Sequence, residues 1–212
     1  MKASTRRITL AGPAGVIEAA VDEPHIAVRG VAVIAHPHPL FGGTMDNKVV
    51  QTLARAFVQC GWSAVRFNFR GVGGSGGVHD QGQGELQDLL AVVQDQAPEG
   101  ALALAGFSFG AFVTSHAIES LWQQRQIDKV VLVGTAASRF NVAPLAPELH
   151  ERALVVHGEI DDTVPLVDVM NWARPQKLPV TVIPGVEHFF HGQLPLLRSL
   201  VARHLTSDRS PI

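Results

Sequence analysis

The chain alternates between short apolar runs and longer segments in which apolar residues recur every three or four positions. The short runs carry hydrophobic side chains at consecutive positions, which is typical of strands buried on both faces of a sheet. Six of these runs are predicted to be strands: residues 30–35, 62–69, 101–107, 128–134, 154–157 and 180–183.

Segments with helical periodicity fill the intervals between these strands. Five helices are predicted, at residues 46–60, 86–93, 111–122, 165–173 and 194–205. Thr44 or Asp46 can cap the first of them, and the pattern of the third indicates an amphipathic helix. Residues 36–43 are rich in proline and glycine and are predicted to form a loop without helical structure.

The order of these elements predicts the fold class. Residues 1–29 alternate weakly and contain turn residues, so we expect an N-terminal antiparallel hairpin there. Strands that alternate with helices predict one α/β domain over residues 1–212, with a mostly parallel central sheet and helices on both faces. Residues 206–212 are expected to be a frayed tail. In such sheets a site lies beyond the carboxyl ends of the strands.

Composition and charge narrow the functional classes. The 212 residues are 46% hydrophobic and 17% charged with a net charge of -2, which argues against nucleic acid or an anionic membrane as partner. No apolar run is long enough to span a bilayer. Cys60 is the only cysteine, which excludes an intrachain disulfide and a cysteine-based zinc site. Without a recognisable signal peptide after Arg6-Arg7, a cytoplasmic protein is expected.

The pattern Gly-x-Ser-x-Gly occurs twice, at residues 106–110 and 73–77. Ser108 lies between a predicted strand and a predicted helix, as the nucleophile elbow of a serine hydrolase requires. Ser75 is followed by glycines and polar residues instead of a helix, and residues 71–77 are predicted to be a flexible loop. Ser108 is therefore the candidate nucleophile.

A serine nucleophile needs a base, and the base needs an acid that orients it. His188 follows the last predicted strand and is the candidate base, with His191 in the same loop as the fallback. Asp161 and Asp162 follow the preceding strand. We expect Asp161 to reach the histidine and Asp162 to cap or lie exposed. The chain order Ser108, Asp161, His188 is that of α/β-hydrolases.

An oxyanion hole requires two backbone N–H donors. One is expected from Phe109, the residue after the nucleophile. The other is expected from the loop after residues 30–35, where His38 or Leu40 is the nearest candidate, because Pro37 and Pro39 have no N–H; His38 is favoured. A metal site built from histidines 36, 38, 188 and 191 is weakly indicated, since no carboxylate or cysteine accompanies them at ligand spacing.

These motifs together resemble the α/β-hydrolase superfamily, and within it the small serine hydrolases related to dienelactone hydrolase. The resemblance is carried by His36-Pro37, Gly42-Gly43, Arg66 to Gly71, Gly106 to Gly110, His157-Gly158 with Asp161 and Val164-Pro165, and His188-Phe189-Phe190. It implies a Ser-Asp-His triad and esterase-type chemistry. Neither a cofactor nor a metal is expected. Dienelactone hydrolases carry a cysteine at the elbow where this chain has Ser108, which argues against a dienelactone substrate.

The sequence thus predicts a serine esterase that forms an acyl-enzyme on a small-molecule ester. Residues 135–151 are too few for a large lid, so we expect an open site. Six phenylalanines lie in or beside the site loops (Phe41, Phe107, Phe109, Phe140, Phe189 and Phe190), and a short apolar acyl group is expected if at least two face the pocket. A thioesterase, a peptidase or a non-catalytic binding protein on the same scaffold are the alternatives. Nothing in the pattern fixes an oligomeric state.

Overall fold

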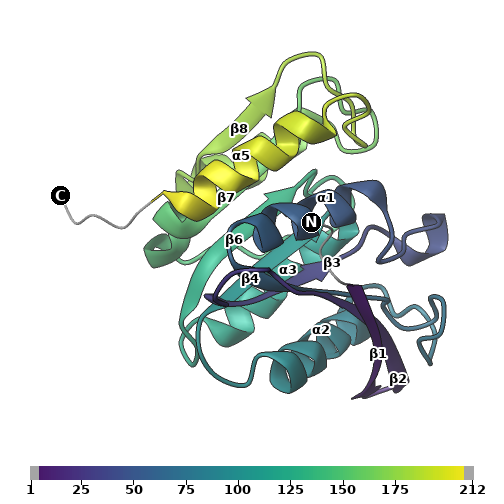
Figure 1. The fold of residues 1–212 in the computed structure, drawn as a ribbon. Coiled ribbons are helices and arrows are strands. Elements are labelled where there is room, and N and C mark those ends of the chain that lie inside the picture. Colours follow the sequence, from purple (N-terminus) through teal and green to yellow (C-terminus); the bar gives the residue numbers. More distant parts are fainter. Residues whose placement is uncertain (1–4, 208–212) are drawn as a thin grey trace.

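The computed structural model describes residues 5–207, and these residues form one eight-stranded sheet with helices on both faces (Figure 1). The strand order across the sheet is β1-β2-β4-β3-β5-β6-β7-β8. The strands are β1 (Thr5–Gly12), β2 (Gly15–Asp22), β3 (Gly30–Ala35), β4 (Trp62–Phe67), β5 (Leu102–Phe107), β6 (Ile127–Val133), β7 (Ala153–Gly158) and β8 (Val180–Ile183).

The sheet is parallel except at its N-terminal edge. β1 and β2 form the expected antiparallel hairpin, and β2 also pairs antiparallel with β4. From β4 to β8 every neighbouring pair is parallel. The predicted α/β fold with a mostly parallel sheet is confirmed, and its consecutive parallel strands direct their following loops to one edge of the sheet.

Two apolar layers cover the two faces of the sheet. α1 (Lys48–Gln59) and α5 (Leu194–Thr206) pack on one face around residues such as Phe57 and Leu197. α2 (Gln83–Gln96), α3 (Phe109–Leu121) and α4 (Leu166–Ala173) contribute to the core of the other face. The central strands are therefore buried on both sides, which explains their continuous apolar runs.

The connection between β6 and β7 contains only one short 3-10 helix, η2 (Pro147–Arg152). A further 3-10 turn, η3 (Arg174–Gln176), follows α4. No lid domain is inserted after β6, so the edge of the sheet that holds the strand-end loops is not covered from that side.

The helix termini differ from the sequence prediction in ways that have local causes. α1 begins at Lys48 because Asn47, not Thr44 or Asp46, is the N-cap; the Asn47 side chain accepts the Val49 N–H at 2.8 Å. Any of these three polar residues can cap a helix, and the sequence pattern does not rank them.

Two segments have more order than the sequence predicts. The 36–43 loop does contain a 3-10 turn, η1 (Pro39–Phe41), since proline at the first helical position needs no N–H acceptor. The 71–77 segment, predicted to be flexible, is tied to β2: Gly76 N–H donates to the Val16 carbonyl at 2.9 Å, and Gly74 N–H donates to Glu18 at 2.8 Å.

The prediction that α3 is amphipathic was wrong. Nine of its 13 residues are buried, because the helix is packed between the sheet and its neighbours instead of facing solvent along one side. At the C-terminus, α5 extends to Thr206, the first residue of the expected tail, and residues 208–212 of that tail lie outside the described part of the chain.

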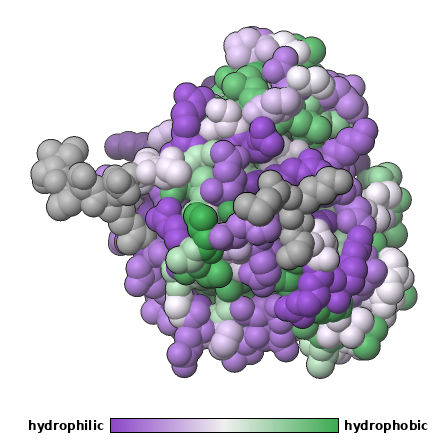
Figure 2. All heavy atoms as spheres, in the orientation of Figure 1, coloured by the Kyte–Doolittle hydropathy of each residue, from purple (hydrophilic) through white to green (hydrophobic). Residues whose placement is uncertain are grey.

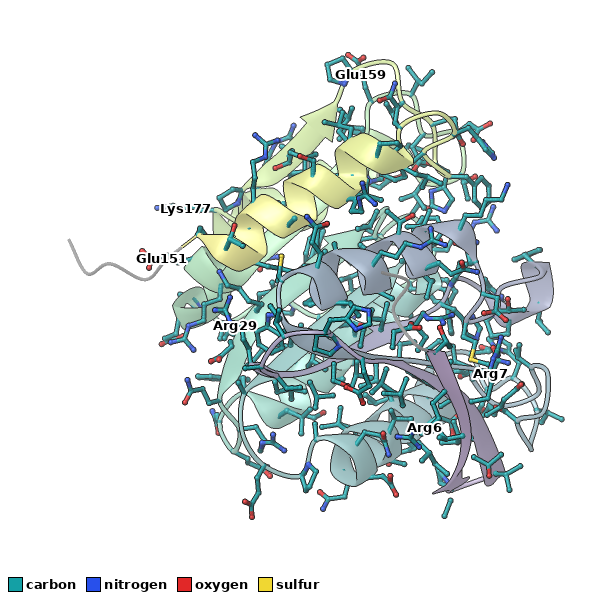
Figure 3. The ribbon with its side chains drawn as sticks, viewed as in Figure 1. Arg6, Arg7, Arg29, Glu151, Glu159 and Lys177 are labelled. Atoms are coloured by element: carbon teal, nitrogen blue, oxygen red, sulfur yellow. The ribbon has the colours of Figure 1, made fainter. Side chains whose placement is uncertain are left out.

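The surface is mixed in polarity. Figure 2 shows a mostly hydrophilic face with hydrophobic residues in small, separate groups. Charged side chains of both signs project from different parts of the molecule, including Arg6 and Arg7 on β1 and, far from them, Glu151 and Lys177 (Figure 3). None of the helices formed by residues 5–207 has the length and apolar character that crossing a membrane requires.

Candidate active site

Ser108 occupies a sharp turn between β5 and α3. Its backbone has φ 56° and ψ -118°, a conformation that non-glycine residues rarely adopt. The flanking glycines are required sterically. A Cβ on Gly106 would lie 2.4 Å from the Gly110 carbonyl oxygen, and a Cβ on Gly110 would lie 2.4 Å from the Ala35 carbonyl oxygen. The turn therefore places the Ser108 hydroxyl beyond the end of the strand, at the N-terminus of a buried helix.

Ser108, His188 and Asp161 form one chain of hydrogen bonds. His188 Nε2 lies 3.0 Å from Ser108 Oγ, and His188 Nδ1 lies 2.6 Å from Asp161 Oδ2. The three residues come from the ends of β5, β7 and β8 and are all buried. Because the carboxylate can only accept, Nδ1 carries the proton, which leaves the Nε2 lone pair directed at the serine hydroxyl.

The Asp161 carboxylate is fixed by backbone donors as well as by the histidine. Its Oδ1 accepts the Thr163 N–H at 3.0 Å and the Val164 N–H at 2.7 Å. His157 Nε2 lies 3.5 Å from Oδ2 and 2.9 Å from the Val164 carbonyl oxygen, and burial lowers the pKa of His157. Asp162 is exposed instead. The two aspartates thus divide as the sequence indicated.

The His188 ring is positioned by a glycine that leaves space for it and by an aromatic side chain that packs against it. Gly134, at the end of β6, would bring a Cβ to 3.1 Å from His188 Cε1, and the Phe107 ring lies 4.9 Å from the imidazole centroid. His191, the fallback base, does not reach the serine. Its side chain is 73% exposed and its Nδ1 lies 3.1 Å from Glu187.

Two backbone N–H groups of residues in the site loops have no acceptor within the described part of the chain. Phe109 is the first residue of α3, so its N–H has no partner within the helix. The His38 N–H is likewise without a protein acceptor among residues 5–207. Leu40 is different, since its N–H donates to His38 Nδ1 at 3.2 Å. Of the two candidates, His38 therefore has the N–H without an acceptor among residues 5–207, and its role as the second oxyanion donor stays a prediction.

The loop that holds His38 is anchored by a second histidine. His36 is fully buried, its Nδ1 donates to the Pro37 carbonyl at 2.6 Å, and its Nε2 accepts the Phe69 N–H at 3.0 Å. Burial lowers the pKa of His36 to about 4, so the ring is neutral at pH 7 and serves as a fixed link between the β3 and β4 loops.

Ser75, in the second Gly-x-Ser-x-Gly match, has a different environment. Its hydroxyl donates to the Asn68 carbonyl at 2.7 Å and accepts the Glu18 N–H at 3.0 Å. Both interactions tie the 71–77 turn to its neighbours, and no histidine of the described chain hydrogen-bonds with the hydroxyl. Among residues 5–207 no group of three histidine, cysteine or acidic side chains is arranged to hold a metal ion, so histidines 36, 38, 188 and 191 do not converge.

A cavity of about 290 Å³ opens over Ser108. Its polar lining residues are His38, Asn47, Ser108, Arg139, Thr163 and His188. Phe41 and Phe189 form apolar walls and are partly exposed, at 74% and 43%. The remaining phenylalanines of the site loops do not line it: Phe107, Phe109 and Phe190 are fully buried, and Phe140 stacks on Phe112. Two of the six candidate rings therefore face the pocket.

The sequence did not single out Asn47, Thr163 or Arg139 as site residues. Asn47 and Thr163 belong to helix-capping and turn positions, where the same residue types are common for structural reasons. Arg139 lies in the β6–β7 connection, one of the loops that the strand order marks for a site. Its cationic side chain in that loop was the available signal.

Comparison with known proteins places this geometry among hydrolases. The family model described as serine aminopeptidase, S33, matches residues 27–160. An uncharacterized protein of Rickettsia prowazekii (strain Madrid E), RP471, is 31% identical over 193 residues, which cover 84% of this chain and 79% of that protein.

Solved structures are similar over nearly the whole chain. XC6422 from Xanthomonas campestris, described as an α/β serine hydrolase without a lid, has a TM-score of 0.84 and 36% identity, covering 97% of this chain and 95% of its own. An α/β serine hydrolase homologue from Coxiella burnetii has a TM-score of 0.81 and 36% identity, covering 95% and 97%.

Proposed function

We propose a serine esterase function for this chain, which belongs to the α/β-hydrolase superfamily. This superfamily includes the serine hydrolases to which the chain is similar in fold. The observation that carries the proposal is the continuous hydrogen-bonded chain from Ser108 through His188 to Asp161, with distances of 3.0 and 2.6 Å. These two hydrogen bonds form the arrangement that activates a serine hydroxyl for attack on an acyl carbon.

In the proposed reaction, Ser108 Oγ attacks the ester carbonyl while His188 Nε2 takes the hydroxyl proton. Asp161 keeps the imidazole in the required tautomer and stabilises the imidazolium that forms. The tetrahedral oxyanion is held by the N–H groups of Phe109 and His38. His188 then returns the proton to the leaving alcohol oxygen, and the acyl group remains on Ser108.

Deacylation uses the same groups in reverse order. A water molecule replaces the alcohol, His188 takes its proton, and attack on the acyl carbon forms a second oxyanion in the same position. The proton returns to Ser108 Oγ as the carboxylic acid leaves. The absence of an inserted lid after β6 leaves the cavity accessible to water at this step.

The size and walls of the cavity support a short acyl group. A volume of about 290 Å³ is at the small end for ligand sites, and Phe41 and Phe189 offer apolar contact beside Ser108. A kcat/KM series over acyl chains of increasing length is expected to peak at a short chain; a maximum at long chains would contradict the acyl preference.

The family description raises aminopeptidase activity as a second candidate. An aminopeptidase must bind the free ammonium group of its substrate, and an acidic side chain is the natural partner for that cation. No aspartate or glutamate lines the cavity, whereas Arg139 does. A permanently charged guanidinium repels an ammonium group, so we favour an ester over a peptide with a free N-terminus.

The test replaces the nucleophile. Ser108→Ala is expected to lower kcat on a chromogenic short-chain ester by at least about 10⁴-fold, since the triad acts as a unit. His191→Ala serves as the matched control, because this exposed histidine lies in the same loop as His188 without touching the serine. Full activity in the Ser108 variant would refute the mechanism.

Two further measurements separate the alternatives. A fluorophosphonate probe is expected to form an adduct on Ser108, and no adduct together with no hydrolysis would favour a binding protein on a hydrolase scaffold. Matched ester, thioester and amide substrates then rank the three acyl classes by kcat/KM, with the ester expected to be fastest.

A further inference from the structure

Arg139 is a charged residue in the lining of the cavity, and residues 5–207 provide no partner for its guanidinium. Two arginines that lie outside this cavity are paired with carboxylates: Arg66 with Asp22 at 2.8 Å, and Arg70 with Asp88 at 2.8 Å. Arg139 forms no ion pair or side-chain hydrogen bond with any residue from 5 to 207, although it lies in the lining of the cavity that contains Ser108. An exposed arginine is ordinary on a surface, but this one lines the same cavity as Ser108.

The charge of the cavity is unbalanced. None of its lining residues is acidic, and the Asp161 carboxylate lies behind His188 and is bonded to it. Desolvation lowers the pKa of His38, helped by the nearby charge of His79 and Arg139 and opposed by the Glu85 carboxylate, which does not line the cavity, so this imidazole is neutral at pH 7. Arg139 is therefore the one permanent cation among the residues that line the cavity, and the α3 N-terminus adds partial positive charge beside it.

We propose that Arg139 determines specificity by binding a carboxylate on the substrate, so that the preferred substrates are small anionic esters such as monoesters of short dicarboxylic acids. This inference rests on the proposed esterase function and names its substrate class. Arginine binds a carboxylate through two parallel N–H donors, which fixes orientation as well as charge. The apolar walls formed by Phe41 and Phe189 suit the short hydrocarbon chain that would separate the carboxylate from the ester.

A carboxylate fits the site better than a phosphate monoester does. A phosphate monoester carries a charge of about -1.5 to -2 at pH 7 and is usually held by several cations or a row of N–H donors. The cavity offers a single guanidinium, which matches a single negative charge.

The main experiment compares two esters of equal length. Mono-4-nitrophenyl glutarate and 4-nitrophenyl valerate share the leaving group and five acyl carbons and differ in the terminal carboxylate. The ratio of their kcat/KM values is measured for the wild type, Arg139→Gln and Arg198→Gln. Arg198 is an exposed arginine on α5, so its replacement removes the same charge away from the cavity.

The wild type is expected to favour the anionic ester, and Arg139→Gln is expected to lower the ratio by about 10-fold, mainly through KM for the anionic ester. The ratio should fall with added salt in the wild type, because Arg139 is exposed and its charge is screened. Arg139→Lys, which keeps the charge and loses the two parallel N–H donors, should retain part of the preference for the anionic ester. Arg198→Gln should leave the ratio unchanged.

A second pair of esters places the carboxylate on the other side of the scissile bond. With 4-acetoxybenzoate and 4-acetoxybenzamide, the anionic group is on the alcohol portion. Whichever pair shows the Arg139-dependent ratio assigns the carboxylate to the acyl or the alcohol side. If neither ratio responds to Arg139→Gln, or if Arg198→Gln changes it equally, the proposal is overturned.

A binding measurement separates this inference from the esterase proposal. Monomethyl glutarate is titrated by calorimetry into Ser108→Ala and into the Ser108→Ala/Arg139→Gln double variant, neither of which can turn it over by the proposed mechanism. Weaker binding to the double variant by 5-fold or more supports the carboxylate site even if the wild type proves not to hydrolyse esters. If both variants bind monomethyl glutarate equally and the wild type hydrolyses neutral esters, the esterase proposal stands and the carboxylate site is refuted.

Discussion

The backbone N–H of His38 is a single donor whose contribution can be isolated by one pair of variants. His38 has φ -53°, which suits proline, so His38→Pro removes the N–H without forcing a new φ. His38→Ala removes the same imidazole and the same acceptor for the Leu40 N–H but keeps the donor. We expect His38→Pro to have a kcat about 10²- to 10³-fold below that of His38→Ala, measured on a short-chain chromogenic ester.

Equal kcat values for the two variants would show that the second oxyanion donor lies elsewhere. Thermal unfolding of both proteins provides the folding control, since the loop is also held by Gly43, whose N–H donates to the His38 carbonyl at 3.0 Å.

At the residue scale, the sequence is most informative where backbone geometry restricts the choice. Ser108 could be located because glycines at 106 and 110 are needed for the close approach that the structure shows. Arg139 could not be located as a site residue, because periodicity places strands and helices but does not determine where an exposed loop side chain points. For the same reason the sequence does not distinguish His38 from Leu40; in the structure the Leu40 N–H already donates to His38 Nδ1.

At the scale of elements, the elbow depends on β3, β5 and α3 approaching one another at glycines. Gly110→Ala would place a Cβ 2.4 Å from the Ala35 carbonyl oxygen and 2.5 Å from the His36 carbonyl oxygen, and neither backbone group can move freely. We expect the free energy of unfolding to fall by at least about 2 kcal/mol, measured by urea denaturation.

Gly185→Ala is the comparison that separates crowding from backbone strain. Gly185 has φ +67°, and no atom lies within 4 Å of the position that a Cβ would take, so only the conformational cost of about 1 kcal/mol is expected. If Gly110→Ala lowers the free energy of unfolding no more than Gly185→Ala does, the contact between α3 and β3 relaxes without cost.

The boundaries of elements were predicted best where the pattern ends abruptly. β8 spans Val180–Ile183 as expected, and α4 begins one residue after the expected Pro165 because that proline is its N-cap. β4 ends at Phe67 instead of residue 69, since Asn68 and Phe69 turn to hydrogen-bond with Glu18 and His36. Such tertiary partners override the local pattern of apolar residues.

At the scale of the whole molecule, buried neutral histidines make stability depend on pH. Burial lowers the pKa of His36 to about 4, and burial with the nearby charge of Lys129 lowers the pKa of His204 to about 4, from the ordinary 6.5. Between pH 4 and 6.5 the unfolded chain binds more protons than the folded protein does. The free energy of unfolding is therefore highest above pH 6.5 and falls as the pH falls toward 4.

Within that pH window each of these histidines lowers the free energy of unfolding by up to about 1.4 kcal/mol for each unit by which the pH falls. Urea unfolding at pH 7.5, 6.5, 5.5 and 4.5 measures the slope for the wild type and His204→Gln, whose amide can still donate to the Arg152 carbonyl. The variant is expected to have the shallower slope between pH 6.5 and 4.5. An unchanged slope would remove His204 from the explanation.

The overall architecture followed from the sequence because topology rules leave few choices. Apolar runs alternating with helical segments give parallel strands with helices on both faces, and the loops after those strands then meet at one edge. The helix placement on each face and the antiparallel pairing of β2 with β4 depend on packing between distant residues, which no local pattern contains.

The backbone strain at Ser108 has an evolutionary consequence. A residue at φ 56° costs about 1–2 kcal/mol unless it is glycine, so selection for stability alone would replace this serine. Ser108→Gly is therefore expected to raise the melting temperature by about 2–4 °C while abolishing esterase activity, as measured by calorimetry and ester hydrolysis. A lower melting temperature would indicate that the hydroxyl itself stabilises the fold; a higher one would make the elbow a site where stability has been exchanged for chemistry.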